Sequence, residues 1–461
     1  MTDRCPAFAD PDAASRPLHV VPQDALEAWR QALPVHQAAF LADCGFTAGA
    51  GDVALLPDTA GRVVAAVVGH GTAASRARDR FLLSRAVSSL PAGDWHFEGL
   101  PEANATEAAL GWLLAQYRFD RYRKPSPPLP GLKCPETVDA ELVLAMAEGE
   151  WLTRDLINTP AADMGPAELQ AAFLSLAERF GAATQVVEGA ALERDFPMVY
   201  AVGKGSERGP RIMSLRWGSS GPSLTLVGKG VCFDTGGLNL KPSSGMLLMK
   251  KDMGGAATVM GLALMIMRLA LPIRLRVIVP AVENAVSGRS LRPKDILRSR
   301  KGLTVEVNDT DAEGRLVLGD ALAWAAEENP EILVSMATLT GAARVAVGPD
   351  LAPFYTDAED LAQGLQAAGR ALADPVWRLP FHTPYEHIIE PGIADLDNAP
   401  GWGFAGSVTA ALFLRRFADH PRYMHFDIYG HTPADLPARP KGAAGQGARA
   451  ILGALPAWLG I

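Results

Sequence analysis

The stretch SLTLVGKGVCFDTGGLNLKP, residues 223–242, decides the fold class of this 461-residue chain. Its first five residues are mostly apolar and rich in branched side chains, which is typical of a strand buried on both faces of a parallel or mostly parallel sheet. The apolar run ends at Gly228, and Lys229, Asp234 and Lys241 follow among glycines that let a small group approach the backbone. Ligand sites of open α/β sheets lie beyond the carboxyl ends of such strands. The stretch therefore predicts an α/β fold with a functional site at this strand end.

The chain on the C-terminal side of this stretch alternates strand and helix patterns. Further buried strands are expected at residues 275–280, 304–307 and 332–337. The helices that would cover the sheet are expected at residues 254–269, 316–328 and 406–417. This alternation predicts a three-layer α/β/α domain with a mostly parallel, mixed sheet.

A proline-rich segment, RYRKPSPPLP at residues 121–130, separates this region from the N-terminal part. Four prolines in ten residues exclude regular structure and suit an extended linker. A strand at 63–69 and a helix at 106–117 predict a smaller α/β domain before it, and a long helical pattern follows at 135–158. We expect an N-terminal α/β domain, a linker with a connecting helix, and a larger C-terminal domain, over residues 1–123, 124–158 and 159–461 respectively.

The composition excludes several classes of protein. With 43 basic and 51 acidic residues, the formal net charge of −8 argues against a protein that mainly coats nucleic acid or anionic membranes. The longest uncharged apolar run, residues 253–267, has 15 residues, fewer than the ~18 that a membrane span needs. The four cysteines form no CxxC pair, and no apolar leader is apparent. These features predict a soluble, cytoplasmic protein with reduced thiols.

Two further loops carry acidic residues next to predicted helices: MKKDMGG at 249–255 and NDTDAEGRL at 308–316. Each has an ordinary explanation on its own, since an Asp before a helix usually caps it and Asp and Gly are common in turns. The GxG at 228–230 lacks the third glycine of a dinucleotide fingerprint, and no GxxxxGK[ST] motif occurs. Nucleotide binding is therefore not predicted.

Taken together, Asp234, Asp252, Asp311 and Glu313 predict a metal centre. In an extended backbone Asp311 and Glu313 point to one side, and a parallel sheet can bring the other two to the same edge. Four carboxylates cannot converge without positive charge, which two divalent cations would supply. Residues 97–381 contain no histidine, so oxygen ligands, with or without a lysine amine, would hold Mn, Mg or Zn.

The motifs resemble, in this order, the signatures of the leucine (cytosol) aminopeptidase family of di-metal exopeptidases. The resemblance covers the chain from about residue 150. It extends to PAVENAVSGRSLRPKDIL (280–297), ATLTGAA (337–343), AGSVTAALFL (405–414) and HFDIYG (425–430). The N-terminal region is similar only in its size and its α/β character. The resemblance implies a metal-dependent aminopeptidase that hydrolyses the N-terminal residue from short peptides through a water activated by two metals.

The resemblance also implies a ligand set for two divalent ions, with Mn or Zn expected. Asp234 and Glu313 would bridge both ions. Lys229 and Asp252 would complete the tighter site, and Asp311 would complete the more exchangeable one. Lysine as a metal ligand comes from the resemblance alone, because the residues themselves indicate only a charge partner at this position.

Further roles follow from the same resemblance. Lys241 would stay charged and face the scissile carbonyl, and Arg315 would hold a bicarbonate ion near the attacking water. The substrate pocket of the family is lined at positions that correspond here to Met249, Thr338, Leu339 and Gly341, although ordinary core packing explains Met249 and Leu339 equally well. One position departs from the family: Asp309 stands where Asn is usual, which puts substrate preference and metal affinity in question.

Two other functions stay open at the level of sequence. The carboxylates could serve a metal-dependent phosphoesterase, or the chain could be a non-catalytic or DNA-binding member of the family with a basic patch at residues 274–300. The resemblance further implies a homohexamer of two stacked trimers. Short peptides with a free N-terminus are the expected partners, and neither a membrane nor nucleic acid is expected.

Overall fold

The computed structural model describes residues 5–124 and 127–461. The chain forms two compact units. One holds the described residues from Cys5 to Trp151 together with Ala434–Lys441, and the other holds Leu152–Pro433 and Gly442–Ile461. The boundary between them falls within helix α6 (Ala140–Asn158). The expected fold of two α/β domains, the larger one C-terminal, is confirmed.

The segment predicted as a linker is described in part, because Pro125 and Ser126 lie outside the described residues. After it, β5 (Gly131–Leu132) pairs in parallel with β4 (Asp94–Glu98) of the smaller unit. The contacts thus assign most of residues 124–158 to the first unit. The division into 1–123, 124–158 and 159–461 stays a prediction about domain boundaries.

The larger unit is built on a mixed, mostly parallel sheet. Its strands follow the order β15-β14-β17-β13-β8-β10-β7-β6, and β9 pairs in parallel with β10. The central strands β17, β13, β8 and β10 run parallel to one another, whereas β14 is antiparallel to β17, and β7 is antiparallel to both β10 and β6. The strand bounds are β6 (Ala183–Glu188), β7 (Arg211–Trp217), β8 (Ser223–Gly228), β9 (Gly230–Asp234), β10 (Arg274–Asn284), β13 (Ile332–Ala337), β14 (Ala352–Thr356), β15 (Val376–Leu379) and β17 (Tyr423–Asp427).

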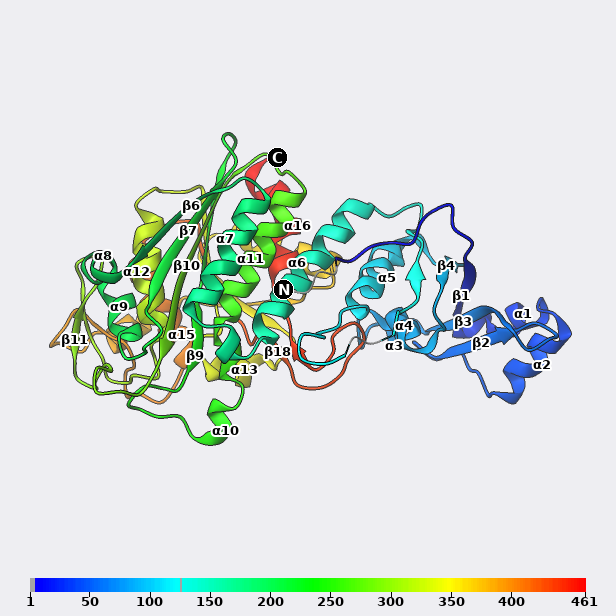
Figure 1. The fold of residues 1–461 in the computed structure, drawn as a ribbon, viewed down its shortest axis with the longest axis horizontal. Coiled ribbons are helices and arrows are strands. Elements are labelled where there is room, and N and C mark those ends of the chain that lie inside the picture. Colours follow the sequence, from blue (N-terminus) through cyan, green and yellow to red (C-terminus); the bar gives the residue numbers. More distant parts are fainter. Residues whose placement is uncertain (1–4, 125–126) are drawn as a thin grey trace. The chain divides into compact units, whose positions relative to one another are not determined.

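Helices cover both faces of this sheet, as Figure 1 shows. On one face α11 packs against β8 and β13, with α16 beside it; on the other, α12 packs against β8 and β10, with α9 and α15 beside it. Residues 254–267 of α11 are all buried, which explains why this helix is apolar all round. The expected three layers are confirmed. The helix bounds are α7 (Pro166–Arg179), α9 (Pro197–Gly203), α11 (Gly254–Arg268), α12 (Gly314–Ala326), α13 (Gly341–Val347), α14 (Glu359–Ala371), α15 (Gly406–Ala418) and α16 (Ala448–Leu459).

The smaller unit has its own sheet, in the order β2-β3-β1-β4-β5. Its strands β1 (Arg16–Pro22), β3 (Val63–Gly71) and β4 are parallel, and β2 (Val53–Pro57) is an antiparallel edge strand. Helix α5 (Glu102–Ala115) buries Trp112 among core residues of this sheet. The strand predicted at 63–69 and the helix predicted at 106–117 correspond to β3 and α5.

One strand predicted for the main sheet belongs elsewhere. Strand β12 (Thr304–Glu306) pairs antiparallel with β11 (Ile296–Arg298) and parallel with β16 (Leu396–Asp397) in a separate small sheet. The Ser299 amide donates to the Leu303 carbonyl at 2.8 Å, which folds the chain back into a local hairpin. Such a turn fixes antiparallel pairing nearby, which the apolar composition of 304–307 could not show.

The described helices include none that is both long enough and apolar enough to cross a membrane. The apolar run predicted to be too short for such a span is α11, which is buried inside the larger unit. The four cysteines, Cys5, Cys44, Cys134 and Cys232, are free thiols.

Candidate metal centre

The predicted site residues lie where parallel strands of the larger sheet end. Lys229 follows β8, Asp234 ends β9, and Thr338 follows β13. Asp252 lies in the short 3-10 helix η4 (Met249–Met253) that leads into α11, and Glu313 directly precedes α12. The carboxyl edge of the sheet thus holds the site, as expected for an open α/β sheet.

Two glycines bring helix α11 against the ends of the strands. A Cβ added to Gly228 would lie 2.6 Å from the Cα of Ala256, and one added to Gly255 would lie 2.1 Å from the carbonyl oxygen of Met336. Side chains larger than hydrogen do not fit at these distances. The Ala256 amide donates to the Lys229 carbonyl at 2.9 Å, and the Lys229 amide donates to the Met336 carbonyl at 3.0 Å. The backbone of Lys229 is therefore fixed between the helix and the neighbouring strand.

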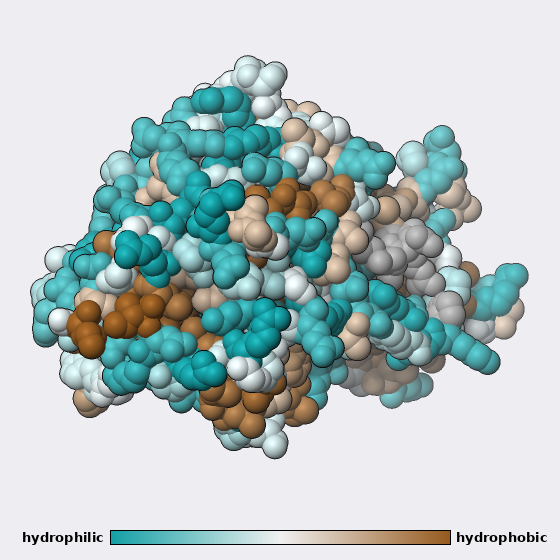
Figure 2. All heavy atoms as spheres, turned by 60° about the vertical axis from the view of Figure 1, so that its left-hand side comes forward, coloured by the Kyte–Doolittle hydropathy of each residue, from teal (hydrophilic) through white to brown (hydrophobic). Residues whose placement is uncertain are grey.

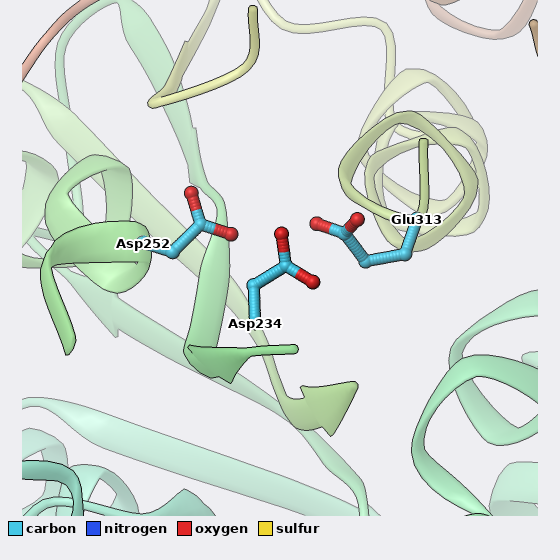
Figure 3. A group of neighbouring side chains, drawn as sticks. All are labelled: Asp234, Asp252 and Glu313. Atoms are coloured by element: carbon cyan, nitrogen blue, oxygen red, sulfur yellow. The ribbon is translucent and has the colours of Figure 1, made fainter. Parts of the chain in front are cut away.

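Three carboxylates converge at this edge. Asp234, Asp252 and Glu313 each place an oxygen within 4.8 Å of the others. Figure 3 shows the three groups turned toward one another from three different elements. The residues are only 2, 3 and 1% exposed. Burying three carboxylates so close together is unfavourable unless cations accompany them.

Lys229 lies within this cluster. Its Nζ is 2.8 Å from Asp252 Oδ2 and 3.0 Å from Glu313 Oε1, and it donates to the Thr338 carbonyl at 3.2 Å. Burial by itself would lower the pKa of Lys229, but the charges of Asp252, Glu313 and Asp234 outweigh burial and raise it above the usual value. Burial, with the charge of Asp234, raises the pKa of Glu313 well above its ordinary range. The lysine therefore acts as the counter-ion of the buried acids.

A second lysine, Lys241, connects Asp234 with Asp311. Its Nζ is 2.8 Å from Asp234 Oδ2 and also contacts Asp311 Oδ1. Burial and then the charge of Asp234 raise the pKa of Asp311 to about 6, although Lys241 opposes this shift. The side chain of Lys241 is 14% exposed, against 3% for Lys229. The second lysine is thus the more accessible of the two to solvent or substrate.

The residues of the cluster fit divalent cations. In the described chain, both oxygens of Glu313 and Oδ2 of Asp252 are buried without a hydrogen-bond donor. Lys229 Nζ is within ion-pair distance of two of these atoms, Asp252 Oδ2 and Glu313 Oε1. With Asp234 and Asp311, the four acids exceed the two lysines by two charges, and by three if Lys229 is neutral. Divalent cations would therefore satisfy both the oxygens and the charge: one would balance the first case, and two with a bound hydroxide the second.

Residues that the sequence analysis missed orient the acidic loops. Asn284 Nδ2 donates to Asp234 Oδ1 at 2.9 Å and to the Thr310 carbonyl at 3.0 Å. Asn398 Nδ2 donates to the Asp309 carbonyl at 2.7 Å. Asn284 is the last residue of β10 and lies within the motif 280–297. A polar residue at the end of a buried strand could have been predicted to lie at the site. Asn398 lies in no motif, and only the fold brings it to the site.

Arg315, in the first turn of α12, is the residue expected to bind an anion. It is 8% exposed, and burial lowers its pKa to about 10 even though Asp427 and Glu313 oppose the shift. Within the described chain its guanidinium donates no hydrogen bond to a protein acceptor, and its Nε is buried. A buried guanidinium without an acceptor suits a small anion.

The cluster opens into a cavity of about 640 Å³. The cavity is lined by the four predicted pocket residues, Met249, Thr338, Leu339 and Gly341, and by Lys229, Asp234, Lys241, Asp252, Asp311 and Arg315. Thr338 has a second role, since its Oγ1 donates to Asp252 Oδ1 at 2.9 Å. Glu313 is not among the lining residues. The structure therefore brings all of the predicted site residues to one place, and all of them except Glu313 line the cavity.

Lys251, Arg344 and Tyr429 are among the further lining residues, and the sequence did not predict them. Burial lowers the pKa of Lys251 to about 8, against the opposing charge of Asp252. The sequence shows two consecutive lysines and could not distinguish them. In the structure Lys250 instead donates to the Asn158 carbonyl at 2.6 Å.

Fold and site together define an α/β protein with a buried carboxylate–lysine centre of the kind that binds divalent cations. The catalytic domain of the cytosol aminopeptidase family matches residues 151–452, and the N-terminal domain of M17 aminopeptidases matches residues 16–135. The chain therefore belongs to the cytosol aminopeptidase family, and the resemblance predicted from the motifs is confirmed.

Relatives support this assignment over different lengths. A probable cytosol aminopeptidase of Xanthomonas oryzae pv. oryzae is 42% identical over 321 residues, which cover 68% of this chain and 64% of the relative. The match thus spans slightly less than two thirds of that relative. A probable cytosol aminopeptidase of Chlorobaculum tepidum is 36% identical over 90% of this chain and 91% of the relative.

Solved structures agree over almost the whole chain. The crystal structure of a cytosol aminopeptidase from Coxiella burnetii has a TM-score of 0.93 and 40% identity, covering 98% of each chain. The bottromycin maturation enzyme BotP, in a complex with Mn, has a TM-score of 0.87 and 33% identity, covering 96% of this chain and 99% of BotP. These similarities extend through the smaller unit as well as the larger one.

Proposed function

We propose that this protein is a metal-dependent aminopeptidase that releases the N-terminal residue of short peptides. The observation that carries the proposal is the buried convergence of Asp234, Asp252 and Glu313 beside an open cavity. Membership in the cytosol aminopeptidase family and the names of the relatives support the same activity. The BotP complex supports Mn as one of the metals, with Zn as the other candidate.

The proposed ligand set is the one implied by the family motifs. Asp234 and Glu313 would bridge two ions, Lys229 and Asp252 would serve one of them, and Asp311 the other. Lys229 would bind as the neutral amine, because a bound cation takes the place of the proton that balances the acids when no metal is present. Two divalent cations at these residues would supply a water of lowered pKa and an electrophile for the scissile carbonyl. The buried oxygens of Glu313 and Asp252 that lack a hydrogen bond support this assignment.

Two cationic residues of the chain have distinct proposed tasks. Lys241 is held as a cation by Asp234 and Asp311 and lines the cavity, so it can stabilise the negative charge that develops on the carbonyl oxygen. Arg315 has no protein acceptor and would hold a bicarbonate ion beside the reacting groups. This leaves the carboxylates of the cluster free to act as ligands.

We further propose a homohexamer in the cytoplasm, with short peptides as substrates and without a membrane or nucleic-acid partner. Several apolar side chains of the larger unit are exposed, and Figure 2 shows apolar areas on its surface. Burial of such residues between copies of the chain would be favourable. They include Leu240, Leu247, Val345, Ile393 and Phe404.

A direct assay tests the activity. The purified chain, loaded with Mn, Zn or Co, is given Leu-peptides with a free or an N-acetylated terminus, and nitrophenyl phosphate as a separate substrate. We expect release of leucine only from the free peptide, and loss of that activity with a chelator. Equal rates on both peptides would exclude an exopeptidase. Hydrolysis of the phosphate ester alone would favour the phosphoesterase alternative.

A further inference from the structure

Two cationic side chains and an aromatic ring form a distinct part of the cavity wall. Lys251 Nζ lies 4.9 Å and the Arg344 guanidinium carbon 5.0 Å from the ring centre of Tyr429. Lys251 is 6% exposed and comes from η4, whereas Arg344 is exposed and comes from α13. All three residues line the cavity that contains the metal centre. We call Lys251, Arg344 and Tyr429 the cationic wall.

The cationic wall has no anionic partner among the described residues. Neither Lys251 nor Arg344 forms an ion pair or donates a side-chain hydrogen bond there. In contrast, Lys229 and Lys241 each contact two carboxylates. Lys250, the neighbour of Lys251 in sequence, donates to a backbone carbonyl. The two cations of the wall are therefore different from the other lysines around the site.

The acids nearest to the wall are already engaged. Asp252 accepts from Thr338 and contacts Lys229. Asp427 accepts from the Leu339 amide at 3.1 Å, and also from Thr340 and Ser407. A buried ammonium that lacks an acceptor is unfavourable, and cation–π contacts compensate for it only in part. An anion that enters the cavity would supply the hydrogen-bond acceptor and the negative charge that Lys251 and Arg344 lack.

The positive charge of Arg344 lies on the substrate side of the cavity. Its Nη2 lies 3.9 Å from the position that a Cβ on Gly341 would take, so the guanidinium folds back over the start of α13. Gly341, Thr338 and Met249 line the same cavity. The positive charge thus faces the space where a bound peptide would extend from the metal centre.

We propose that Lys251 and Arg344, supported by Tyr429, recognise a carboxylate of the peptide and make the enzyme prefer anionic substrates. The inference rests on the proposed aminopeptidase function and names its substrate class. Two carboxylates of a short peptide could occupy the wall: the side chain of an acidic N-terminal residue, or the C-terminal carboxylate of a dipeptide. Both present the same bidentate acceptor to a guanidinium.

The experiment compares charged and neutral substrates of equal shape on the metal-loaded, full-length protein. One arm measures kcat/KM for the 4-nitroanilides of Glu and Gln, and the other compares Leu-Gly with Leu-glycinamide. We expect the carboxylate form to be favoured about tenfold or more in one arm, as for one charge-assisted contact. The favoured arm identifies which carboxylate is bound.

Variants then assign the preference to the wall. We expect Lys251→Met with Arg344→Met to lower the ratio of kcat/KM for the favoured substrate to that for its neutral counterpart about tenfold. Because Lys251 is buried next to Asp252, the exposed position is also tested alone: Arg344→Glu should favour Lys-4-nitroanilide over its Glu counterpart. The matched control is Arg370→Met, which removes one charge from an exposed position of α14 and should change neither preference.

Each outcome bears on a defined claim. Equal kcat/KM for acid and amide in both arms, or a preference that survives in the double variant, would overturn the inference while leaving the aminopeptidase activity intact. If no peptide is cleaved with any metal, the proposed function fails instead. Calorimetric titration of the metal-loaded protein with glutamate and with glutamine then decides the inference. Tighter binding of glutamate, lost in the double variant, would uphold it. Equal binding of the two amino acids would overturn it.

Discussion

At the scale of single residues, Glu313 is the most informative side chain of the site. It is 1% exposed, and both of its carboxylate oxygens are buried without a hydrogen bond within the described chain. A buried carboxylate without hydrogen bonds is unfavourable, and one neighbouring lysine, which Glu313 shares with Asp252, does not remove the penalty. The residue is therefore better explained by binding a cation than by stabilising the fold.

We expect Glu313→Gln to lower turnover more than about a hundredfold, because the amide removes a charged ligand. The same change should reduce the metal content of the purified protein without lowering the unfolding temperature of the chelated protein. Activity assays, elemental analysis and thermal unfolding check the three parts. Glu327→Gln, in an exposed pair with Arg300, serves as the control. Full metal content in Glu313→Gln would contradict the ligand assignment.

Two substitutions of Asp309 can separate the effect of its charge from the effect of its hydrogen bond to the backbone. Its Oδ1 accepts from the Asp311 amide at 2.8 Å, which fixes the turn that carries Asp311. Asn keeps this acceptor but removes the charge, whereas Ala removes both. We expect Asp309→Asn to retain kcat/KM on Leu-4-nitroanilide within about threefold and Asp309→Ala to lose about tenfold, as for one hydrogen bond. Equal losses in both variants would show that the charge itself is required.

The sequence predicted the acidic residues of the site but not the wall beside it. Asp234, Asp252 and Glu313 stand in glycine-rich loops between strong strand and helix patterns, so their chemistry is visible locally. Lys251 and Arg344 meet only because η4 and α13 lie near each other in space, and no sequence spacing relates them. The arrangement of residues from distant loops depends on how the sheet is ordered.

At the scale of elements, the strands that are buried on both faces were the most predictable. Strand β8 matches the predicted 223–227 to within one residue, and β13 matches 332–337. Strand β9 was not predicted, because its glycines and Asp234 weaken the strand pattern, and it forms only by pairing with β10. The antiparallel direction of β7 relative to β10 was likewise not visible, since composition does not encode direction.

Helix α9 depends on an acid from a distant helix. Asp320 of α12 is fully buried, and its Oδ2 accepts from the amides of Met198 and Val199 at 2.8 and 3.4 Å. Its Oδ1 accepts from the Arg300 amide at 2.8 Å. We expect Asp320→Ala to lower the free energy of unfolding by about 1–3 kcal/mol, because three backbone donors, two of them buried, lose their acceptor.

Urea denaturation of the metal-loaded protein checks this expectation. The control is Asp419→Asn: the side chain of Asp419 is 80% exposed and pairs with Lys301 at the surface, and Asn tolerates the left-handed backbone of this position. That change should alter stability by less than about 1 kcal/mol. Equal effects of the two substitutions would show that Asp320 does not hold the start of α9.

At the scale of the whole molecule, one buried histidine links stability to pH. His425 in β17 is 0% exposed, and burial, followed by the charge of Arg315, lowers its pKa to about 3. Its Nδ1 bonds to Ser335 Oγ at 2.9 Å. The histidine of the unfolded chain binds a proton near pH 6.5, whereas the buried, neutral His425 of the folded chain does not. The contribution of neutral His425 to the free energy of unfolding is therefore complete above pH 6.5 and is lost as the pH falls toward 3.

We expect the wild type to lose about 2 kcal/mol more than His425→Asn between pH 7 and pH 5, since Asn can retain the bond to Ser335 but does not titrate. Urea denaturation of both proteins in the same chelator-containing buffer measures the difference. Parallel pH profiles for the two proteins would mean that His425 is protonated in the folded state or is not buried in solution.

Metal removal should affect the two units differently. The acidic cluster lies in the larger unit, and no second group of this kind occurs elsewhere in residues 5–124 and 127–461. A ligand at a hundred times its Kd stabilises the state that binds it by about 2.7 kcal/mol.

Differential scanning calorimetry measures the effect. Mn should raise the unfolding temperature of the larger unit and a chelator should reverse the rise, whereas the unfolding temperature of the smaller unit stays unchanged. Glu313→Gln should reduce the metal-dependent shift. A shift of equal size in that variant would place the bound metal away from the cluster, and the absence of any shift in the wild type would mean that the buried oxygens do not hold metal at all.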